Sequence, residues 1–454
     1  MTTIWAEMAL TPRGWERDVL VRITPEGRIA DVTAGTARQG HAVGHLLPAP
    51  VNGHSHAFQR AMAGLTERRG PDSHDGFWAW RRLMYRFLDR LVPEQVQAIT
   101  AFVQMEMLEA GYAASVEFHY LHHGPDGVPY DNLAEMAERV IAAARQTGIG
   151  LTLLPVLYRF GGCDGRALSP GQDRFGNDFD RFARLVEACR SAIAAGPQDW
   201  ILGVAPHSLR AVGIQDLDHI PALAPEGPIH MHLAEQTREV EEVRAVLGAR
   251  PVEWVLANLA IDARWNMVHC TQMRPEETKA LARSGSTAVL CPITEANLGD
   301  GVFDGVRWLE NGGDLSVGSD SNIRISFSEE LRALEYSQRL RDRSRAVLAS
   351  REFSTGRCLF ETIVTGGARA AARRTGGLRR NAWADLMALD GAHPDLAGLS
   401  GDTILDGYVF AGDDRMITDV WSAGRHMVQE GRHIDRDRIR SAYQGAVRDV
   451  RDAI

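Results

Sequence analysis

Apolar runs and amphipathic stretches alternate through most of the chain. Eight short apolar runs have the length and the aliphatic, β-branched composition of buried strands. They are Leu46–Asn52, Ala113–Phe118, Gly150–Leu157, Ile201–Ala205, Pro228–Leu233, Asn266–Cys270, Ala288–Cys291 and Leu315–Gly318. Longer stretches with helical periodicity lie between them, at Pro93–Ala110, Asp131–Thr147, Asp178–Ala195, Arg238–Leu247 and Pro275–Arg283. Eight strand and helix units close a parallel barrel, so the pattern predicts an α/β fold with a (β/α)8 TIM-like barrel.

The two ends of the chain have a different sequence pattern, with short strand-like pieces and few helical stretches. Short β-like pieces precede the barrel at Thr3–Leu10, Asp18–Ile23 and Arg28–Val32. After a long helical region, β-like pieces return at Asp385–Leu389, Gly407–Phe410 and Ile417–Ala423. We expect the pieces from both ends to pair into one small β-sandwich domain. The predicted division is residues 1–45 and 376–434 for this domain, 46–375 for the barrel and 435–454 for a C-terminal helix.

Composition and charge narrow the classes of function. The chain has 454 residues, of which 44% are hydrophobic and 24% charged, which is typical of a globular protein. Its 50 basic and 59 acidic residues give a net charge of −9, which argues against a nucleic-acid partner. Lys279 is the only lysine. A phosphate-binding loop of the Gly-Lys-Ser/Thr type is therefore excluded, and only one candidate for a Schiff-base lysine remains.

Cysteine usage and the N-terminus bear on location. The five cysteines are odd in number and include no Cys-x-x-Cys pair, so we read them as free thiols in a reducing compartment. The first residues lack the basic and apolar segments of a signal peptide, and no run of about 18 apolar residues occurs. We therefore expect a cytoplasmic protein without a membrane partner.

Metal-binding residue types gather at the ends of the predicted strands, which is where barrel enzymes hold their active sites. They are His54 and His56 just after the first strand, His232 near the end of the fifth with Glu235 just after it, His269 at the end of the sixth and Asp320 just after the eighth. Residues i and i+2 of an extended chain face the same side, so His54 and His56 can face one ion. Imidazole and carboxylate ligands suit Zn²⁺ or Fe²⁺ with one position left for water, which indicates a hydrolytic metal site.

The segments NGHSH, HLAEQ, MVHC and VGSDSN, in this order, resemble the amidohydrolase superfamily, in its branch of mononuclear zinc aminohydrolases. The resemblance implies that the metal is held by His54, His56, His232 and Asp320. The fifth strand also offers His230, but the His-x-x-Glu spacing of the family selects His232 and leaves His230 as a supporting group. The bridging lysine of the binuclear members lies on strand four, whereas Lys279 follows strand six, so one metal is expected.

The chemistry implied by this resemblance is attack of a metal-bound hydroxide on a C=N carbon. Glu235 is placed to carry the water proton to the leaving nitrogen. His269 and Asp320 are expected to hydrogen-bond the hydroxide and the tetrahedral centre.

Arginine, glutamine and tyrosine side chains near the predicted site favour an anionic substrate, because arginine binds carboxylates bidentately. Within the superfamily, HSHAFQRAMAGL, FWAWRRLMYR, EFHYLHH and APHSLRAV are similar to the formimidoylglutamate deiminases, which hydrolyse N-formimino-L-glutamate to N-formyl-L-glutamate and ammonia in histidine breakdown. That similarity implies a homodimer and a substrate bound by Gln59, Arg81, Tyr120, His207, Arg210 and Glu235. Arg82 and Arg60 remain alternatives to Arg81 for the carboxylate.

Two other hypotheses make different demands on the same residues. An aminohydrolase of a neutral heterocycle, of the guanine, cytosine or triazine type, would use the metal site without depending on arginine. A metal-free barrel could serve as a binding or scaffold protein, because a fold does not dictate an activity. Metal analysis of the purified protein distinguishes the metal-free scaffold from either metal-dependent enzyme. Ammonia release measured on each substrate distinguishes the deiminase from the aminohydrolase of a neutral heterocycle.

Overall fold

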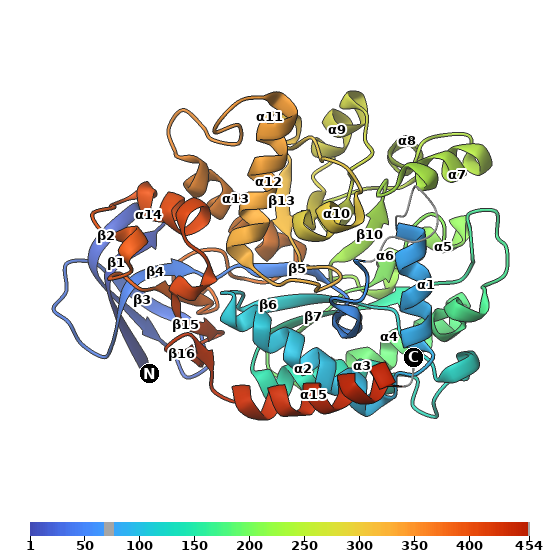
Figure 1. Ribbon diagram of the computed structural model, residues 1–454, viewed down its shortest axis with the longest axis horizontal. Coiled ribbons are helices and arrows are strands. Elements are labelled where there is room, and N and C mark those ends of the chain that lie inside the picture. Colours follow the sequence, from blue (N-terminus) through green and yellow to red (C-terminus); the bar gives the residue numbers. More distant parts are fainter. Residues whose placement is uncertain (68–76, 453–454) are drawn as a thin grey trace.

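Parallel strands and surrounding helices are arranged as a barrel in the computed structural model, which describes residues 1–67 and 77–452 (Figure 1). The barrel has eight strand positions, the fourth of which is shared by the short β8 and β9. One arc pairs β5, β6, β7 and the short β8 and β9, and the other pairs β10, β11, β12 and β13. Parallel bridges join the arcs at Val204–Ile229 and Ser55–Asp320. The strands are β5 Val51–Ser55, β6 Ala114–His119, β7 Gly150–Leu157, β8 Ile201–Leu202, β9 Ala205–Pro206, β10 Ile229–Leu233, β11 Trp265–His269, β12 Thr287–Leu290 and β13 Asp314–Val317. The predicted α/β barrel is confirmed.

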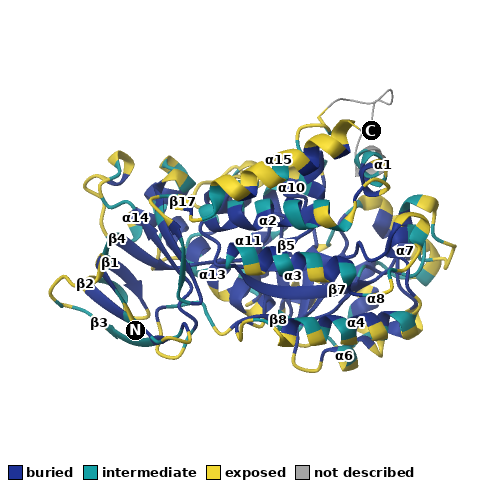
Figure 2. Cartoon of the chain, turned by 90° about the horizontal axis from the view of Figure 1, so that it is seen from below, coloured by how far each residue is buried: buried dark blue, intermediate teal, exposed yellow. Residues whose placement is uncertain are grey.

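Helices surround the barrel strands, most of which are buried along their whole length (Figure 2). The α-helices in this region are α1 Phe77–Leu88, α2 Pro93–Glu109, α3 Glu135–Thr147, α4 Phe179–Ala194, α5 Ile214–Leu217, α6 Ile220–Leu223, α7 Thr237–Leu247, α8 Pro251–Asn258, α9 Pro275–Ala282, α10 Pro292–Leu298, α11 Gly305–Glu310, α12 Phe327–Asp342 and α13 Thr355–Ala370. Short 3₁₀ segments lie at Ala57–Met62, Pro125–Gly127 and Pro170–Phe175. Local sequence explains many boundaries: the Asp178 side chain accepts the Arg181 N–H at the start of α4, and Gly148 ends α3 with a φ of 70°.

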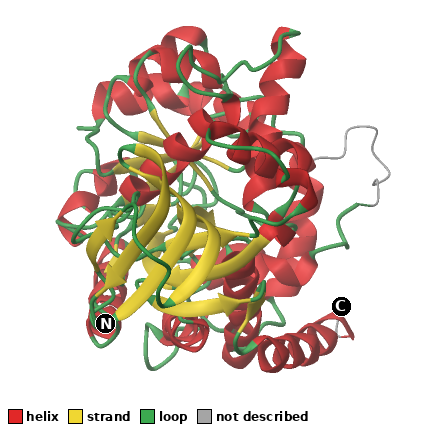
Figure 3. Cartoon of the chain, turned by 90° about the vertical axis from the view of Figure 1, so that its left-hand side faces the viewer, coloured by secondary structure: helices red, strands yellow, loops and turns green. Residues whose placement is uncertain are grey.

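The two chain ends pair in one small domain, as predicted. Its sheet has the order β17-β16-β15-β14-β4-β1-β2-β3, in which β4 joins the N-terminal strands to the C-terminal ones. The strands are β1 Thr2–Thr11, β2 Gly14–Ile23, β3 Ile29–Thr33, β4 His41–Pro48, β14 Leu386–Leu389, β15 Ile417–Ser422, β16 Arg425–Gln429 and β17 Arg432–His433. Hydrogen bonds connect all eight, so the expected sandwich is a single strongly curved sheet over its own apolar core (Figure 3).

Two predicted strands differ from the structure. The run Leu46–Asn52 is divided between β4, which ends at Pro48 in the small sheet, and β5, which begins at Val51 in the barrel. Pro50 lies between them and has no N–H to donate to a ladder. The run Gly407–Phe410 is wrong as a strand, because residues Gly407–Ala411 form a π-helix after α14 (Asp402–Asp406). A four-residue apolar run has no periodicity that separates a strand from a buried helical turn.

A buried ionic network joins the barrel to the small domain. Arg373, which follows α13, donates to Asp199 and to Asp385 over 2.7–2.9 Å, and all three side chains are at most 2% exposed. Arg425 of β16 donates to both oxygens of the Asp199 carboxylate. Ion pairs this deeply buried need such complete hydrogen bonding, which here fixes the relative position of the two parts.

The remaining segments complete the outside of the molecule. The helix α15 (Arg436–Asp452) runs beside α2, where Tyr443 stacks on Phe102 with ring centroids 3.9 Å apart (Figure 1). Further 3₁₀ segments lie at Pro394–Leu396 and Asp414–Met416. Among the residues that the structure describes, no helix combines the length and the apolar character needed to cross a bilayer.

Candidate metal centre and substrate pocket

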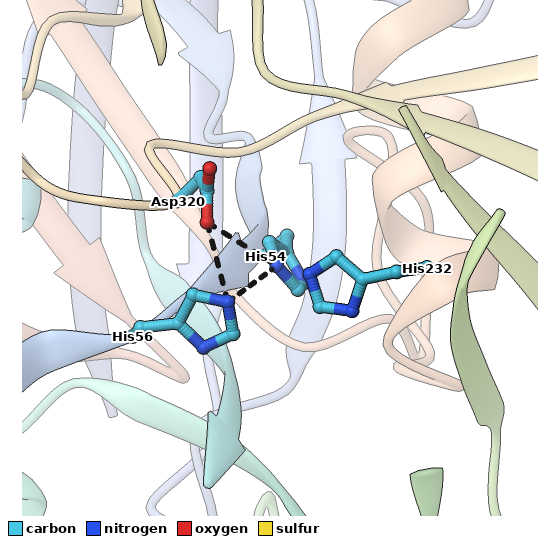
Figure 4. Close-up of side chains that lie close together, drawn as sticks. All are labelled: His54, His56, His232 and Asp320. Carbon is cyan, nitrogen blue, oxygen red and sulfur yellow. Dashed lines mark hydrogen bonds and ion pairs between the residues drawn. The ribbon is translucent and has the colours of Figure 1, made fainter. Parts of the chain in front are cut away.

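Four predicted ligand side chains converge at the carboxyl ends of β5, β10 and β13 (Figure 4). One possible ligand atom from each of His54, His56, His232 and Asp320 lies within 4.8 Å of those of the others, and all four residues are buried. The Nε2 atoms of His54 and His56 are 3.1 Å apart, and Asp320 Oδ1 lies 3.5 Å and 3.2 Å from them. Tetrahedral coordination at about 2.0–2.1 Å requires ligand atoms roughly 3.3 Å apart, which these spacings match.

Backbone groups orient two of the imidazoles. His56 Nδ1 lies 2.9 Å from the Phe118 carbonyl, and His232 Nδ1 lies 3.2 Å from the His207 carbonyl. A carbonyl only accepts, so each Nδ1 carries the proton and each Nε2 presents its lone pair to the centre of the cluster. This is the tautomer that a metal ion requires, and the donor set therefore fits a divalent ion.

Strained backbone turns aim the side chains at the strand ends. Asp320 has a φ of 44°, and His269 has a φ of 69°, in the left-handed region that costs energy for residues with a Cβ. Backbone hydrogen bonds hold the first turn, from Asp320 N to His54 O and from His56 N to Asp320 O, both 2.9 Å long. Gly318 allows this close approach, because a Cβ there would lie 2.4 Å from His54 N.

Electrostatics in the cluster favour neutral imidazoles beside an ionised carboxylate. Burial and the neighbouring His56 lower the pKa of His54 to about 3, and burial lowers that of His232 well below its usual value. Burial opposes ionisation of Asp320, but its contacts with His54 and His56 hold its pKa below the ordinary range. Both shifts produce the protonation states in which these groups bind metals.

Glu235 and His269 line the pocket beside this cluster, together with Asp320. Burial raises the pKa of Glu235, although the charges of His269 and Arg210 partly oppose this. Burial also disfavours a charged His269, but Glu235 and a hydrogen bond with Glu295 outweigh it and raise its pKa to about 10. The charge of each group thus favours the charged form of the other, which suits an acid and base pair.

The predicted substrate-binding residues line the same pocket, whose empty volume is about 540 Å³ and opens to solvent. Its wall contains Gln59, Arg81, Tyr120, His207 and Arg210. Gln59 Nε2 donates to the Tyr120 hydroxyl over 2.7 Å, and Arg81 Nη2 donates to the Tyr158 hydroxyl over 2.9 Å. Two arginines in the wall of one pocket make it suitable for an anionic ligand.

The remaining candidates have other surroundings. Arg60 donates to the carbonyls of Asn322 and Ile323 and pairs with Glu106, so it does not line the pocket. The side chain of Arg82 lies outside the described residues. His230 is buried and its Nε2 contacts the Ala370 carbonyl at 2.8 Å, away from the cluster. Lys279 is exposed on α9, which agrees with the expectation of no bridging lysine.

Three polar residues in or beside the pocket were not predicted from the sequence. Glu295 of α10 lies with its Oε1 3.2 Å from His269 Nδ1 and accepts the Cys291 N–H. Tyr158 and Tyr85 line the pocket around Arg81. Tyr158 directly follows β7, so its position at a strand end was a usable signal, whereas Glu295 lies in a helix and had none.

Comparison with known proteins decides the family. A sequence profile described as "Amidohydrolase family" matches residues 45–427, and one described as "Formimidoylglutamate deiminase HutF, N-terminal domain" matches residues 1–42. The chain belongs to the amidohydrolase family. It is 46% identical over 450 residues to a formimidoylglutamate deiminase from Pseudomonas aeruginosa, covering 98% of each chain. This places it among the formimidoylglutamate deiminases, as the sequence motifs predict, and makes it a hydrolase of C–N bonds.

Solved structures of amidohydrolases share the whole architecture. A crystal structure of an amidohydrolase from Brucella melitensis has a TM-score of 0.95 at 46% identity, covering 99% of this chain and 100% of that one. An adenosine deaminase from Xanthomonas campestris, solved with bound zinc, has a TM-score of 0.82 at 21% identity and covers 100% and 98%. The second likeness concerns the fold alone, and its zinc belongs to that protein. The family is metal-dependent, and the buried three-histidine, one-aspartate cluster is the candidate site here.

Proposed function

We propose that this amidohydrolase hydrolyses N-formimino-L-glutamate to N-formyl-L-glutamate and ammonia, with one Zn²⁺ held by His54, His56, His232 and Asp320. The observation that carries the proposal is the presence of Arg81, Arg210 and the carboxylate Glu235 in one pocket with that ligand cluster. The substrate has one amidine carbon for water to attack and two carboxylates for arginines to bind. The activity of the Pseudomonas aeruginosa relative supports the same substrate. Fe²⁺ prefers similar ligands, and elemental analysis distinguishes the two ions.

Bound Zn²⁺ supplies hydroxide at neutral pH, because it lowers the pKa of water to about 7. The side chains of this chain supply the proton transfers. Glu235 takes one proton from the attacking water and delivers it to the imino nitrogen, and the remaining water proton passes from the hydroxyl of the tetrahedral centre to the same nitrogen, so that the C–N bond breaks with ammonia as the leaving group. The water oxygen becomes the formyl oxygen, which balances the reaction of one amidine and one water to one amide and one ammonia.

His269 and Asp320 stabilise the reacting centre. His269 has a raised pKa and would present an N–H toward the oxygen of the tetrahedral centre, where negative charge develops. Glu295 holds the other ring nitrogen of His269 at 3.2 Å and thereby fixes the direction of that N–H. The ionised Asp320 would accept a hydrogen bond from the attacking oxygen.

The substrate carboxylates are assigned to the arginine side of the pocket. Arg81 and Arg210 provide charge-assisted hydrogen bonds, each roughly twice as strong as a neutral one. Gln59, Tyr120 and His207 provide further polar groups in the wall of the same pocket. The Gln59 Oε1 atom is buried without a hydrogen-bond partner, and the amide N–H of the substrate would satisfy it.

Ammonia release from N-formimino-L-glutamate tests the proposal, with guanine, cytosine and N-formimino-L-aspartate as comparison substrates. We expect the glutamate derivative to have the highest kcat/KM. Preferential turnover of guanine or cytosine would instead support the neutral-heterocycle hypothesis. A homodimer and a cytoplasmic location also belong to this proposal, and light scattering and cell fractionation test them.

A further inference from the structure

A second group of metal-binding side chains lies in the small β domain, outside the barrel pocket. It consists of His41 at the start of β4, Asp419 on β15 and His426 on β16. The nitrogen and oxygen atoms that they offer lie within 4.8 Å of one another. We propose that these three residues form a second metal site, which binds a divalent transition ion such as Zn²⁺.

The spacing of the donor atoms supports this site. Asp419 Oδ1 lies 2.9 Å from His41 Nε2 and 2.8 Å from His426 Nε2, so both rings direct the same nitrogen at one oxygen. The corresponding distances in the barrel cluster are 3.1–3.5 Å. An ion at the centre needs only a few tenths of an ångström of widening, because bonds of about 2.0–2.1 Å place ligands roughly 3.3 Å apart.

Surrounding contacts hold the ligands in place. Trp421 pairs with His426 across β15 and β16 and stacks on its ring, with centroids 4.3 Å apart and planes at 17°. The same indole meets the His41 ring edge-on at 5.6 Å. The Asp419 side chain is 9% exposed and contacts both imidazole rings through the same carboxylate oxygen. Two imidazoles already oriented toward a fixed carboxylate lose little conformational entropy when an ion binds.

The exposure of the ligands and their chemical type indicate which ions the second site would bind. The His41 side chain is 44% exposed and that of His426 is 22% exposed, so solvent reaches the site and water can complete the coordination. Two nitrogens and one oxygen favour Zn²⁺, Cu²⁺, Ni²⁺ or Co²⁺ over Ca²⁺ or Mg²⁺, which prefer oxygen ligands. The site would connect β4, from the N-terminal segment, to β15 and β16, from the C-terminal segment. An ion there would stabilise the folded state by binding it preferentially.

Calorimetric titration of the metal-loaded enzyme with Zn²⁺ tests this site, in a buffer that does not coordinate metals. We expect the wild type to bind one further equivalent and to gain in Tm, while its rate of ammonia release stays unchanged. His41→Gln removes the most exposed ligand, and Asp419→Asn alters the carboxylate that both histidines contact. Both variants should therefore fail to bind the second equivalent of Zn²⁺ and should show no gain in Tm. His393→Gln is the matched control, because His393 is a half-exposed histidine beside Asp395 without a second histidine.

Two results would overturn the second site. One is the absence of saturable Zn²⁺ binding beyond the barrel site in the wild type. The other is binding that persists unchanged in His41→Gln. Circular dichroism of each variant separates loss of binding from loss of structure, and Co²⁺ absorption spectra of wild type and variants give an independent readout of coordination.

Discussion

Glu295 Oε1 lies 3.2 Å from His269 Nδ1, and both residues are buried, His269 at the carboxyl end of β11 and Glu295 in α10, which follows β12. The carboxylate is itself fixed by the Cys291 N–H over 2.8 Å. The contact selects one orientation and one proton position for the imidazole that faces the substrate pocket. Glu295 is thus a positioning residue, which acts through His269.

Replacement of Glu295 by Gln should keep the metal and reduce kcat by roughly 10- to 100-fold, as is typical when an orienting partner is lost. KM should change less than kcat, because His269 acts on the transition state. The pH profile should shift as well, since the carboxylate helps to keep His269 protonated. Glu253→Gln, on the exposed side of α8, is the control. A normal kcat and pH profile in Glu295→Gln would show that His269 needs no such support.

Glu235→Gln should retain the metal content of the wild type but lose at least ~10²-fold in turnover. Glutamine cannot accept the water proton, although it fills the same volume. Steady-state ammonia release together with elemental analysis measures both quantities. Near-normal turnover would move the proton-transfer role to another acid, and Glu117, whose pKa burial raises to about 8, would be examined first.

Arg81→Met and Arg210→Met should each lower kcat/KM for N-formimino-L-glutamate by roughly 10- to 150-fold, the equivalent of about 1.5–3 kcal/mol for a charged hydrogen bond. The metal content should not change. Arg244→Met, an exposed arginine on α7, serves as the control. Unchanged kcat/KM in both pocket variants would contradict the assignment of the substrate carboxylates to these arginines.

The Asp199 network should affect stability in acid. Burial raises the pKa of Asp199, but hydrogen bonds from Arg425 and the charge of Arg373 outweigh it, so the folded pKa lies below the unfolded one. The resulting stabilisation is full above about pH 4 and disappears as the pH falls through the folded pKa. In Asp199→Asn, the loss of unfolding free energy between neutral and acidic pH should be smaller than in the wild type. Urea midpoints across this range measure it, and equal pH dependence would contradict the assignment.

Arg373→Met should be the more severe change at that interface. It leaves the buried Asp199 and Asp385 without their shared cation, which typically costs about 3–5 kcal/mol of unfolding free energy. Arg425→Met should cost less, because its side chain is 31% exposed. Equal urea midpoints for both variants would show that burial does not govern this network.

The barrel and its ligand cluster could be predicted because each carries a signal in the local sequence. Each predicted strand is an apolar run, and His54, His56, His232 and Asp320 lie at or just after the carboxyl ends of such runs. The helical turn at Gly407–Ala411 could not be predicted, since four apolar residues fit either conformation. The sequence alone did not decide whether Arg60 or Arg81 binds the substrate carboxylate, because this depends on the path of the chain after β5. In the structure that path places Arg60 against the Asn322 and Ile323 carbonyls. Glu295 was missed because one glutamate in a helix resembles any other until its neighbours are known.

The most direct test of the central claim is metal reconstitution of chelator-treated enzyme, followed by ammonia release from N-formimino-L-glutamate. The account predicts that the rate rises linearly with added Zn²⁺, reaches its maximum at one equivalent per chain and does not change when a second equivalent binds. His54→Ala and Asp320→Ala should show no recovery at any metal concentration. Full activity in the chelated enzyme, or a rate that rises up to two equivalents, would contradict a mononuclear metal-dependent deiminase.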